Sequence, residues 1–332
     1  MPVNLRMSAQ TLSLPNAQHW IISRRDDLIF FCGSALFGYL LSLWALSAGR
    51  LPTRFMIAFA FAIDGPHVYS TATRGFFDSK ERRRFRLMWF VALPLCLAIG
   101  PLVVSLAGGT LFLIMVATLS HLHISKQHMG FVMIYKRKAR ERDDFKVDKY
   151  VTLALLILPF LFYLSAVLTQ STRLLALFLI PSAAIAGWFI AHQIRKENRN
   201  IPKLILIGLF VPLQWVAWSF AASDPSSLGR VIIAAAITNV GHSLQYLRLM
   251  WFHNHNRYGE RIGFLGLISR KWIYFFATAV VLAAIPVLAA NVFTWSLFPP
   301  LVTGFLFFHF VLDSKLWRIR GDKELGDALH LN

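Results

Sequence analysis

Three histidines and a lysine fall within eight residues of a strongly apolar segment, in the run TLSHLHISKQHMGFVMIYKRK at 118–138. The histidines are His121, His123 and His128, and the run ends in a basic cluster. Ionisable side chains inside a membrane span are costly, so they usually face the bundle interior or a wet cavity and mark function. On a helix, His121 and His128 share one face, whereas His123 points elsewhere. The plain alternative is that one or two of these rings only hydrogen-bond to neighbouring helices.

Three further apolar segments carry polar groups of the same kind. They read AIDGPHVYSTATR at 62–74, TNVGHSLQYLRLMW at 238–251 and FFHFVLDSKLWRIR at 307–320. Each contains one histidine with a polar neighbour three or four residues away, a spacing that puts both side chains on one helix face. These histidines and their neighbours are His67 with Asp64 and Thr71, His242 with Gln245, and His309 with Asp313.

Four of these histidines are also expected at a similar depth in the membrane. His67, His128, His242 and His309 each precede a Lys or Arg by six to eight residues. If those cations mark the cytoplasmic boundary, the four rings lie about 9–12 Å inside it, because a helix rises 1.5 Å per residue. Independent core histidines have no reason to share a depth, so the pattern favours one site. The alternative is a structural hydrogen-bond network in a tightly packed bundle.

The residue types at this site favour a metal. Neutral imidazole suits iron, copper, zinc and nickel, and nitrogen ligands inside hydrocarbon suit iron that activates oxygen. Dioxygen and apolar substrates both concentrate in the bilayer. We therefore expect His67, His128, His242 and His309 to bind iron (Fe2+) and to be the catalytic residues of an oxygenase that acts on a lipophilic small molecule. Auxiliary or supporting roles are expected for Asp64, Thr71, His121, His123, Gln245 and Asp313. His121 lies deeper than His128, and a second metal, a substrate channel and a bonded core residue all remain open for it.

The elements that must position these residues are transmembrane helices. The chain has 332 residues, of which 56% are hydrophobic, and several runs of about 20 apolar residues are typical of a polytopic helical membrane protein. We predict an all-α transmembrane bundle of about ten spans, with a segment at 1–27, a single helical domain at 28–317 and a tail at 318–332. The predicted spans are 28–48, 55–74, 87–107, 110–135, 150–169, 173–194, 203–222, 229–252, 272–292 and 297–317.

The net charge of +18 is explained by topology. Loops after the even-numbered spans are long and basic, such as RGFFDSKERRRFR and KRKARERDDFKVDK, whereas those after the odd-numbered spans are short and nearly uncharged. The positive-inside rule then places both termini and the basic loops in the cytoplasm, where they contact anionic headgroups of the bilayer. This distribution argues against nucleic-acid binding. The expected location is the bacterial inner membrane, as a multi-pass protein.

The order of the four histidine motifs resembles that of the Brp/Blh-type membrane carotene dioxygenases. The matching positions are GPH at Pro66 and His67, QHMG at His128 and Gly130, GHSLQ at His242, and HFVLD at His309 and Asp313. The family's third motif has two histidines, whereas this chain has His242 and then Gln245, and the acid of the first motif precedes its histidine here. The resemblance implies iron, dioxygen and cleavage of a polyene to aldehydes.

Two other function classes use the same residues. Histidines on facing spans can be the axial ligands of a haem in an electron-transfer protein. Intramembrane histidine and aspartate are equally natural in a proton-coupled transporter, although the sequence has no evident inverted repeat. Membrane desaturases and alkane hydroxylases need HxxHH clusters, which are missing from this sequence.

Overall fold

The computed structural model describes residues 20–292, 296–319 and 321–331, and within them it contains helices and no strand. The predicted all-α class is therefore confirmed. Most of the predicted N-terminal segment, residues 1–19, lies outside the described residues. The helices are α1 Arg24–Asp26, η1 Asp27–Cys32, α2 Ser34–Ala48, α3 Thr53–Phe59, η2 Ala60–Asp64, α4 Gly65–Gly75, α5 Ser79–Arg84, η3 Met88–Ala92, α6 Leu93–Lys138, α7 Phe145–Thr169, α8 Leu175–Ile194, α9 Ile201–Ala222, α10 Leu228–Tyr258, α11 Phe264–Arg270, α12 Trp272–Val292, α13 Phe298–Leu316 and α14 Lys323–Ala328.

All ten predicted segments are helical, but their number as membrane spans is not confirmed. Among the described residues, five helical stretches are long and apolar enough to cross a membrane, namely Arg24–Ala48, Met88–Lys138, Phe145–Thr169, Leu175–Ile194 and Ile201–Ala222. The pair α11 and α12, bent by 118°, makes a sixth if it counts as one span. These helices are compatible with a multi-pass membrane protein. The helices that carry most of the predicted site, α4, α10 and α13, are outside this set, since polar side chains interrupt their apolar sequence.

Two of the predicted spans, 87–107 and 110–135, belong to one long helical stretch broken at a glycine. Gly108 has φ 82° and ψ 168°, which is not a helical conformation. A positive φ is open to glycine at little cost because it lacks a Cβ atom. The break therefore separates an apolar first half from the half of α6 that carries the histidines.

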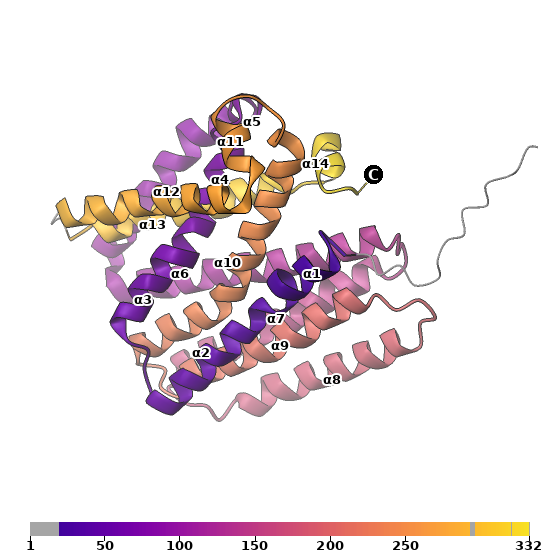
Figure 1. The fold of residues 1–332 in the computed structure, drawn as a ribbon. Helices are drawn as coiled ribbons and strands as arrows, with labels where there is room; N and C mark the ends of the chain where they lie inside the picture. Colours follow the sequence, from indigo (N-terminus) through magenta and orange to yellow (C-terminus); the bar gives the residue numbers. More distant parts are fainter. Residues whose placement is uncertain (1–19, 293–295, 320, 332) are drawn as a thin grey trace, which may run out of the picture.

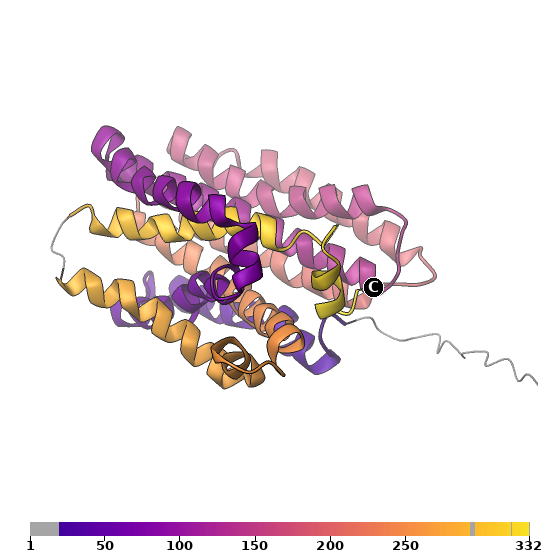
Figure 2. The same cartoon turned by 90° about the horizontal axis from the view of Figure 1, so that it is seen from above.

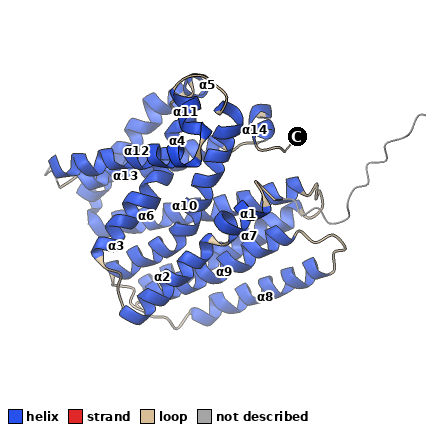
Figure 3. Ribbon diagram, viewed as in Figure 1, coloured by secondary structure: helices blue, strands red, loops and turns tan. Residues whose placement is uncertain are grey.

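The helices form two groups joined by α10 (Figure 1). On one side α2, α7, α8 and α9 run next to one another, and on the other α12 and α13 pack against α4 and α6. Helix α10 contacts both groups, and seen from above the long helices run in similar directions (Figure 2). The ribbon coloured by secondary structure shows the short helices α5, α11 and α14 together at one end, near the C-terminus (Figure 3). Three of the helices that carry the predicted ligand histidines, α4, α6 and α13, thus belong to one group, and the fourth, α10, joins it to the other.

Helices α6 and α13 approach closely through small residues. A Cβ atom on Gly304 would lie 2.5 Å from the backbone oxygen of Cys96, and one on Gly100 would lie 2.1 Å from the backbone oxygen of Pro300. Both distances are shorter than any real contact, so only glycine allows this packing. Small residues at helix contacts are typical of membrane bundles, because they let two backbones pack directly. The contact fixes the position of α13 relative to the half of α6 that precedes Gly108.

A buried ionic cluster ties together the loop ends of α6, α7 and α9. Lys136 and Lys203 both contact Glu141 and Asp148, and Lys196 adds a bond of 3.0 Å to Glu141. Burial alone would raise the pKa of Glu141, but hydrogen bonds from Lys203, Lys196 and Lys136 outweigh it and lower the pKa to about 2. A buried charge needs such partners, and here they hold the basic loop after α6 against the bundle.

Candidate metal centre

Four histidines from four helices meet at one point of the bundle. His67 of α4, His123 of α6, His242 of α10 and His309 of α13 each offer a ring nitrogen, and these four atoms lie within 4.8 Å of one another. The rings of His67, His242 and His309 are buried, and the His123 side chain is 10% exposed. Four convergent imidazoles with this spacing match the donor set of a single bound transition-metal ion.

The orientation of His67 is fixed by its own helix. Its Nδ1 lies 3.2 Å from the backbone oxygen of Asp64, which can only accept a hydrogen bond, so Nδ1 donates. Nε2 of the neutral ring then carries a lone pair, and it lies 3.0 Å from Nε2 of His242. A ring N–H held by a backbone carbonyl is the usual arrangement of a metal-binding histidine.

A directed chain of hydrogen bonds orients His309. Tyr246 Oη donates to the carboxylate of Asp313 at 2.7 Å, so in its 2.9 Å contact with Thr71 the threonine hydroxyl is the donor. Thr71 Oγ1 therefore accepts from Nδ1 of His309, which lies 2.7 Å away. The chain leaves the lone pair on Nε2 of His309, the nitrogen that has no hydrogen-bond partner.

Three ring nitrogens of the four-histidine group are buried without a partner. They are Nε2 of His123, Nδ1 of His242 and Nε2 of His309. A buried polar atom that is left unpaired costs free energy, and a bound cation would satisfy such atoms. Nε2 of His123 also lies 4.0 Å from Asp313, and its ring stacks on Phe310 with centroids 4.4 Å apart. The residues present therefore fit a metal ion held by imidazole nitrogens, with a carboxylate close by.

The structure brings together three of the four predicted ligands. The fourth, His128, lies outside the group: its Nδ1 bonds the backbone oxygen of Ile124 at 2.9 Å, and its ring packs on Phe210. His123, predicted only in an auxiliary role, takes its place. The two positions are five residues apart on α6, about 140° around the helix, so they face different neighbours.

The other predicted residues divide into two groups. Thr71 and Asp313 belong to the chain on His309, and the Asp64 side chain lies 3.7 Å from Nδ1 of His67 and accepts from Asn239. Gln245 instead donates to the backbone oxygen of Phe31 at 2.7 Å, away from the histidines.

His121 has hydrogen-bond partners at both ring nitrogens. Its Nε2 lies 3.0 Å from the backbone oxygen of Leu156, and its Nδ1 accepts from Trp218 at 3.2 Å. The ring stacks on Phe160, with centroids 4.5 Å apart. These bonds agree with the bonded core residue among its predicted roles, although the ring also lines a cavity.

Tyr246 also lies at the site, although it is not among the residues predicted from the sequence. It lies four residues after His242 and hence on the same helix face, which was the available signal. Its ring centroid lies 5.3 Å from those of both His67 and His309. A phenol at this place links the histidine group to Asp313, and through that carboxylate to Trp317, whose Nε1 donates to Asp313 at 2.6 Å.

An apolar cavity of about 440 Å³ adjoins the centre. His67, His123 and His242 contribute to its wall, together with residues of α3, η2, α6, α10 and α13. Its volume falls within the usual range for small-molecule sites, roughly 300–1,000 Å³. A lipophilic molecule in this cavity would lie directly against three of the four histidines.

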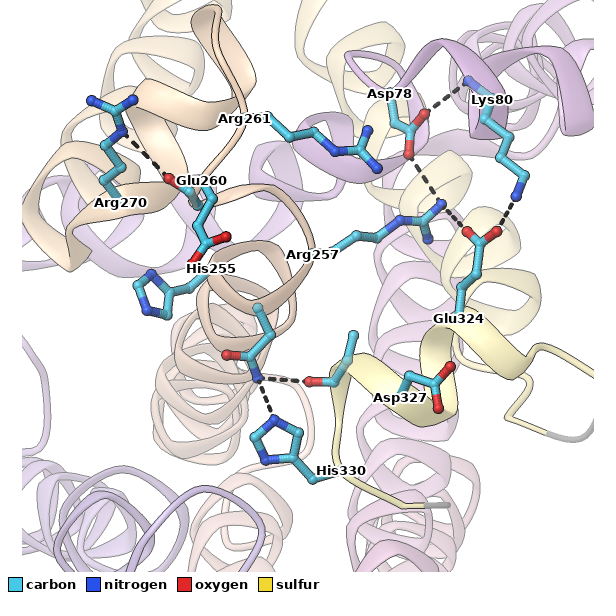
Figure 4. Close-up of a pocket in the computed structure, with 13 residues that line it drawn as sticks. Asp78, Lys80, His255, Arg257, Glu260, Arg261, Arg270, Glu324, Asp327 and His330 are labelled. Carbon is cyan, nitrogen blue, oxygen red and sulfur yellow. Dashed lines mark hydrogen bonds and ion pairs between the residues drawn. The ribbon is translucent and has the colours of Figure 1, made fainter.

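A second hollow, of about 760 Å³, lies at the end of the bundle where α5, α11 and α14 gather (Figure 4). Many of its charges pair with one another: Arg257 contacts Asp78 at 3.3 Å and Glu324 at 2.7 Å, and Lys80 also bonds Glu324. Burial alone would raise the pKa of Asp78, but hydrogen bonds, the largest from Tyr258, lower it. The four histidines of the centre do not line this hollow, and we interpret its wall as a network that fixes the helix ends.

Comparison of the chain with protein-family models, with curated proteins and with solved structures gives no match in any of the three. No relative therefore supports or contradicts the resemblance to membrane carotene dioxygenases, and the function is inferred from the site.

Proposed function

We propose that the protein is an integral-membrane, metal-dependent oxygenase with one non-haem iron held by His67, His123, His242 and His309. The observation that carries this proposal is the convergence of four imidazoles, three of which have a buried nitrogen without a partner. The bound iron would supply the activation of dioxygen. The substrate is a lipophilic molecule in the adjoining apolar cavity.

The chain's own residues orient the ligands and exclude water. The Asp64 carbonyl and Thr71 hold His67 and His309 with their lone pairs toward the common point. Asp313 places a negative charge near the centre, which stabilises a cation there. The apolar wall of the cavity keeps bulk water from the reacting atoms.

The oxygenase reaction with the fewest co-substrates is cleavage of a carbon–carbon double bond. Both atoms of dioxygen then enter the two carbonyl products, so no external reductant is required. Carotenoid cleavage to aldehydes belongs to this class. Hydroxylation is the other oxygenase reaction, and it needs two electrons and two protons from a reduced carrier.

We also propose the finer topology of ten spans with both termini in the cytoplasm, in a bacterial inner membrane. The basic loops support this orientation. The helices α3–η2–α4, α10 and α13 would cross the membrane despite their polar residues, because those residues face the bundle interior and pair there.

The two alternatives use the same histidines differently. A haem between two axial rings needs room for the macrocycle, and the remaining two rings, with their nitrogens within 4.8 Å, occupy that room. A proton-coupled transporter is the stronger competitor, because buried His and Asp are natural in proton relays.

Metal content and the visible absorption spectrum of the purified protein test the proposal. We expect about one iron per chain and no haem Soret band. Replacing any of the four histidines by Ala should remove the metal, while His128→Ala, the matched control on α6, should retain it. A metal-free protein under mild purification, or four single variants that keep full metal content, would contradict the proposal. Feeding with a carotenoid and detection of aldehydes then tests the substrate.

A further inference from the structure

The apolar cavity beside the histidines is lined by both buried and exposed residues. Its inner end is formed by His67, His123 and His242, and its wall continues along α3 and α10 to residues that are exposed on the outside of the bundle. Two of these exposed residues are Ile57, 55% exposed, and Ile232, 45% exposed. We take this exposed end as the mouth of the cavity.

The depth of the cavity, from its mouth to the histidines, follows from helix geometry. Ile57 precedes His67 by ten residues, and Ile232 precedes His242 by ten, so each helix separates the mouth from the histidines by about 15 Å. A volume of about 440 Å³ over this depth leaves room for one hydrocarbon chain rather than two side by side. The depth is about half of the ~30 Å hydrocarbon core, so a chain from one leaflet can reach the histidines.

In the proposed topology the mouth opens toward lipid, at the end of the bundle remote from the basic loops. Ile57 lies within the first turns of α3, after the short connection GRLPTR, whereas the basic loop after α4 follows the histidine end of the same helical stretch. Exposed isoleucines at this depth contact hydrocarbon rather than water. A ligand therefore enters sideways from the bilayer, between α3 and α10.

Charge distinguishes the two ends of the cavity. Thr53 lines the mouth, and the next residue, Arg54, is exposed and lies on the same helix face as Ile57, three residues on. At the inner end, the Asp64 carboxylate lines the wall near His67. An anionic headgroup is attracted at the mouth and repelled inside, whereas an apolar chain fits the wall between the two.

We propose that this cavity binds a single-chain anionic amphiphile of the fatty-acid type, with its carboxylate beside Arg54 and its chain end against the histidines. The inference rests on the proposed function and narrows its substrate: the bound chain, with a double bond near its far end, would take the place of a carotenoid at the metal centre. It predicts that the reacting carbons lie far from the headgroup.

Photolabelling in lipid nanodiscs tests the proposal without use of the metal. The probes are two C16 fatty acids with a diazirine either at the chain end or next to the carboxylate, and the adducts are mapped by mass spectrometry of the full-length protein. We expect the chain-end probe to label the cavity wall around Ala117 and His123 of α6, and the other probe to label Thr53 to Ile57. A reversed pattern, or adducts confined to the lipid-facing surface of α2 and α8, would overturn the proposal.

Matched variants separate entry from general effects on the fold. Ala60→Trp places a bulky ring on the lining near the mouth and should abolish labelling inside the cavity. Ala58 is exposed two residues earlier, on α3, and does not line the cavity, so Ala58→Trp should leave labelling inside the cavity unchanged. Equal labelling of both variants would refute entry at this mouth.

The role of Arg54 has its own readout. Arg54→Gln should weaken binding of the acid probe by about fivefold, the effect of one interfacial cation, and should not change binding of the uncharged methyl ester. Equal effects on both probes would refute the carboxylate contact. Labelling inside the cavity of a protein that holds no metal would support this inference and contradict the proposed function. A protein that binds the metal but shows no labelling inside the cavity would support the proposed function and contradict this inference.

Discussion

The hydrogen-bond chain from His309 to Asp313 makes a quantitative prediction about metal affinity. Thr71→Val removes the oxygen that accepts from Nδ1 of His309 at 2.7 Å, while the volume of the side chain is kept. The ring can then turn, or carry its proton on Nε2, and either change withdraws a ligand lone pair. Loss of the group that orients a metal-binding histidine typically costs 10–100-fold in affinity.

The same hydrogen-bond chain predicts a graded series of losses in metal affinity. Tyr246→Phe deletes a hydroxyl that accepts from Thr71 at 2.9 Å and donates to Asp313 at 2.7 Å, so Thr71 loses its fixed direction but keeps its oxygen. We expect about a tenfold loss for this variant, a larger loss for Thr71→Val, and no more than a few-fold loss for Thr71→Ser, which retains the hydroxyl.

The assay is a competition titration with a chelator, using Fe2+ and, for its visible ligand-field bands, Co2+. The bands report the ligand geometry independently of activity, and circular dichroism checks that each variant folds. A Thr71→Val protein that binds both metals within twofold of the wild type would refute the proposed role of the chain. Equal losses for Thr71→Val and Thr71→Ser would also refute it, because the hydroxyl would then be irrelevant.

Three further predictions concern the ligand set, the pH dependence of stability and the packing of helices. His123→Ala should lose the metal while His128→Ala keeps it, as measured by metal analysis; the opposite result would restore the ligand set predicted from sequence. The pKa of Glu141 is lowered to about 2 from its usual 4.5, so this group stabilises the fold fully above pH 4.5, and its contribution is lost as the pH falls toward 2. The melting temperature of Glu141→Gln in detergent should therefore lie below that of the wild type at pH 7, and the difference should shrink at pH 3; a constant difference would contradict this reasoning. Gly304→Ala should destabilise the protein by about 1–3 kcal/mol through overpacking, whereas Gly130→Ala, which meets nothing within 4 Å, should not; thermal unfolding of both variants checks this.

Apolar runs and charge patterning were enough to predict the helices. They did not predict which helices are long and apolar enough to count as membrane spans. Each predicted segment coincides with a helix, and even the break near residue 108 fell where two spans were expected to meet. The span count differs for two reasons: polar side chains of the site lower the apolarity of α4, α10 and α13, and the two predicted spans 87–107 and 110–135 form one helical stretch. A polar site inside a bundle removes part of the signal that marks its own helices as membrane-spanning.

The prediction of the site was limited by helix rotation rather than by depth. The distance in sequence to the cations at the helix ends predicted a common depth for His67, His242 and His309, and these three side chains do converge. On α6 the same argument chose His128 over His123, since only His128 precedes the basic cluster by a matching number of residues.

The two faces of α6 explain why depth was a poor guide there. His121 bonds Trp218 of α9 and His128 packs on Phe210 of α9, so the face that these two share turns toward the group of α2, α7, α8 and α9. His123 points instead to α13, where its ring stacks on Phe310. The stacking of His123 on Phe310 thus places α13 against one particular face of the second half of α6. Residues from a distant part of the chain therefore determine which histidine of α6 joins His67, His242 and His309, and the sequence of α6 alone could not identify it.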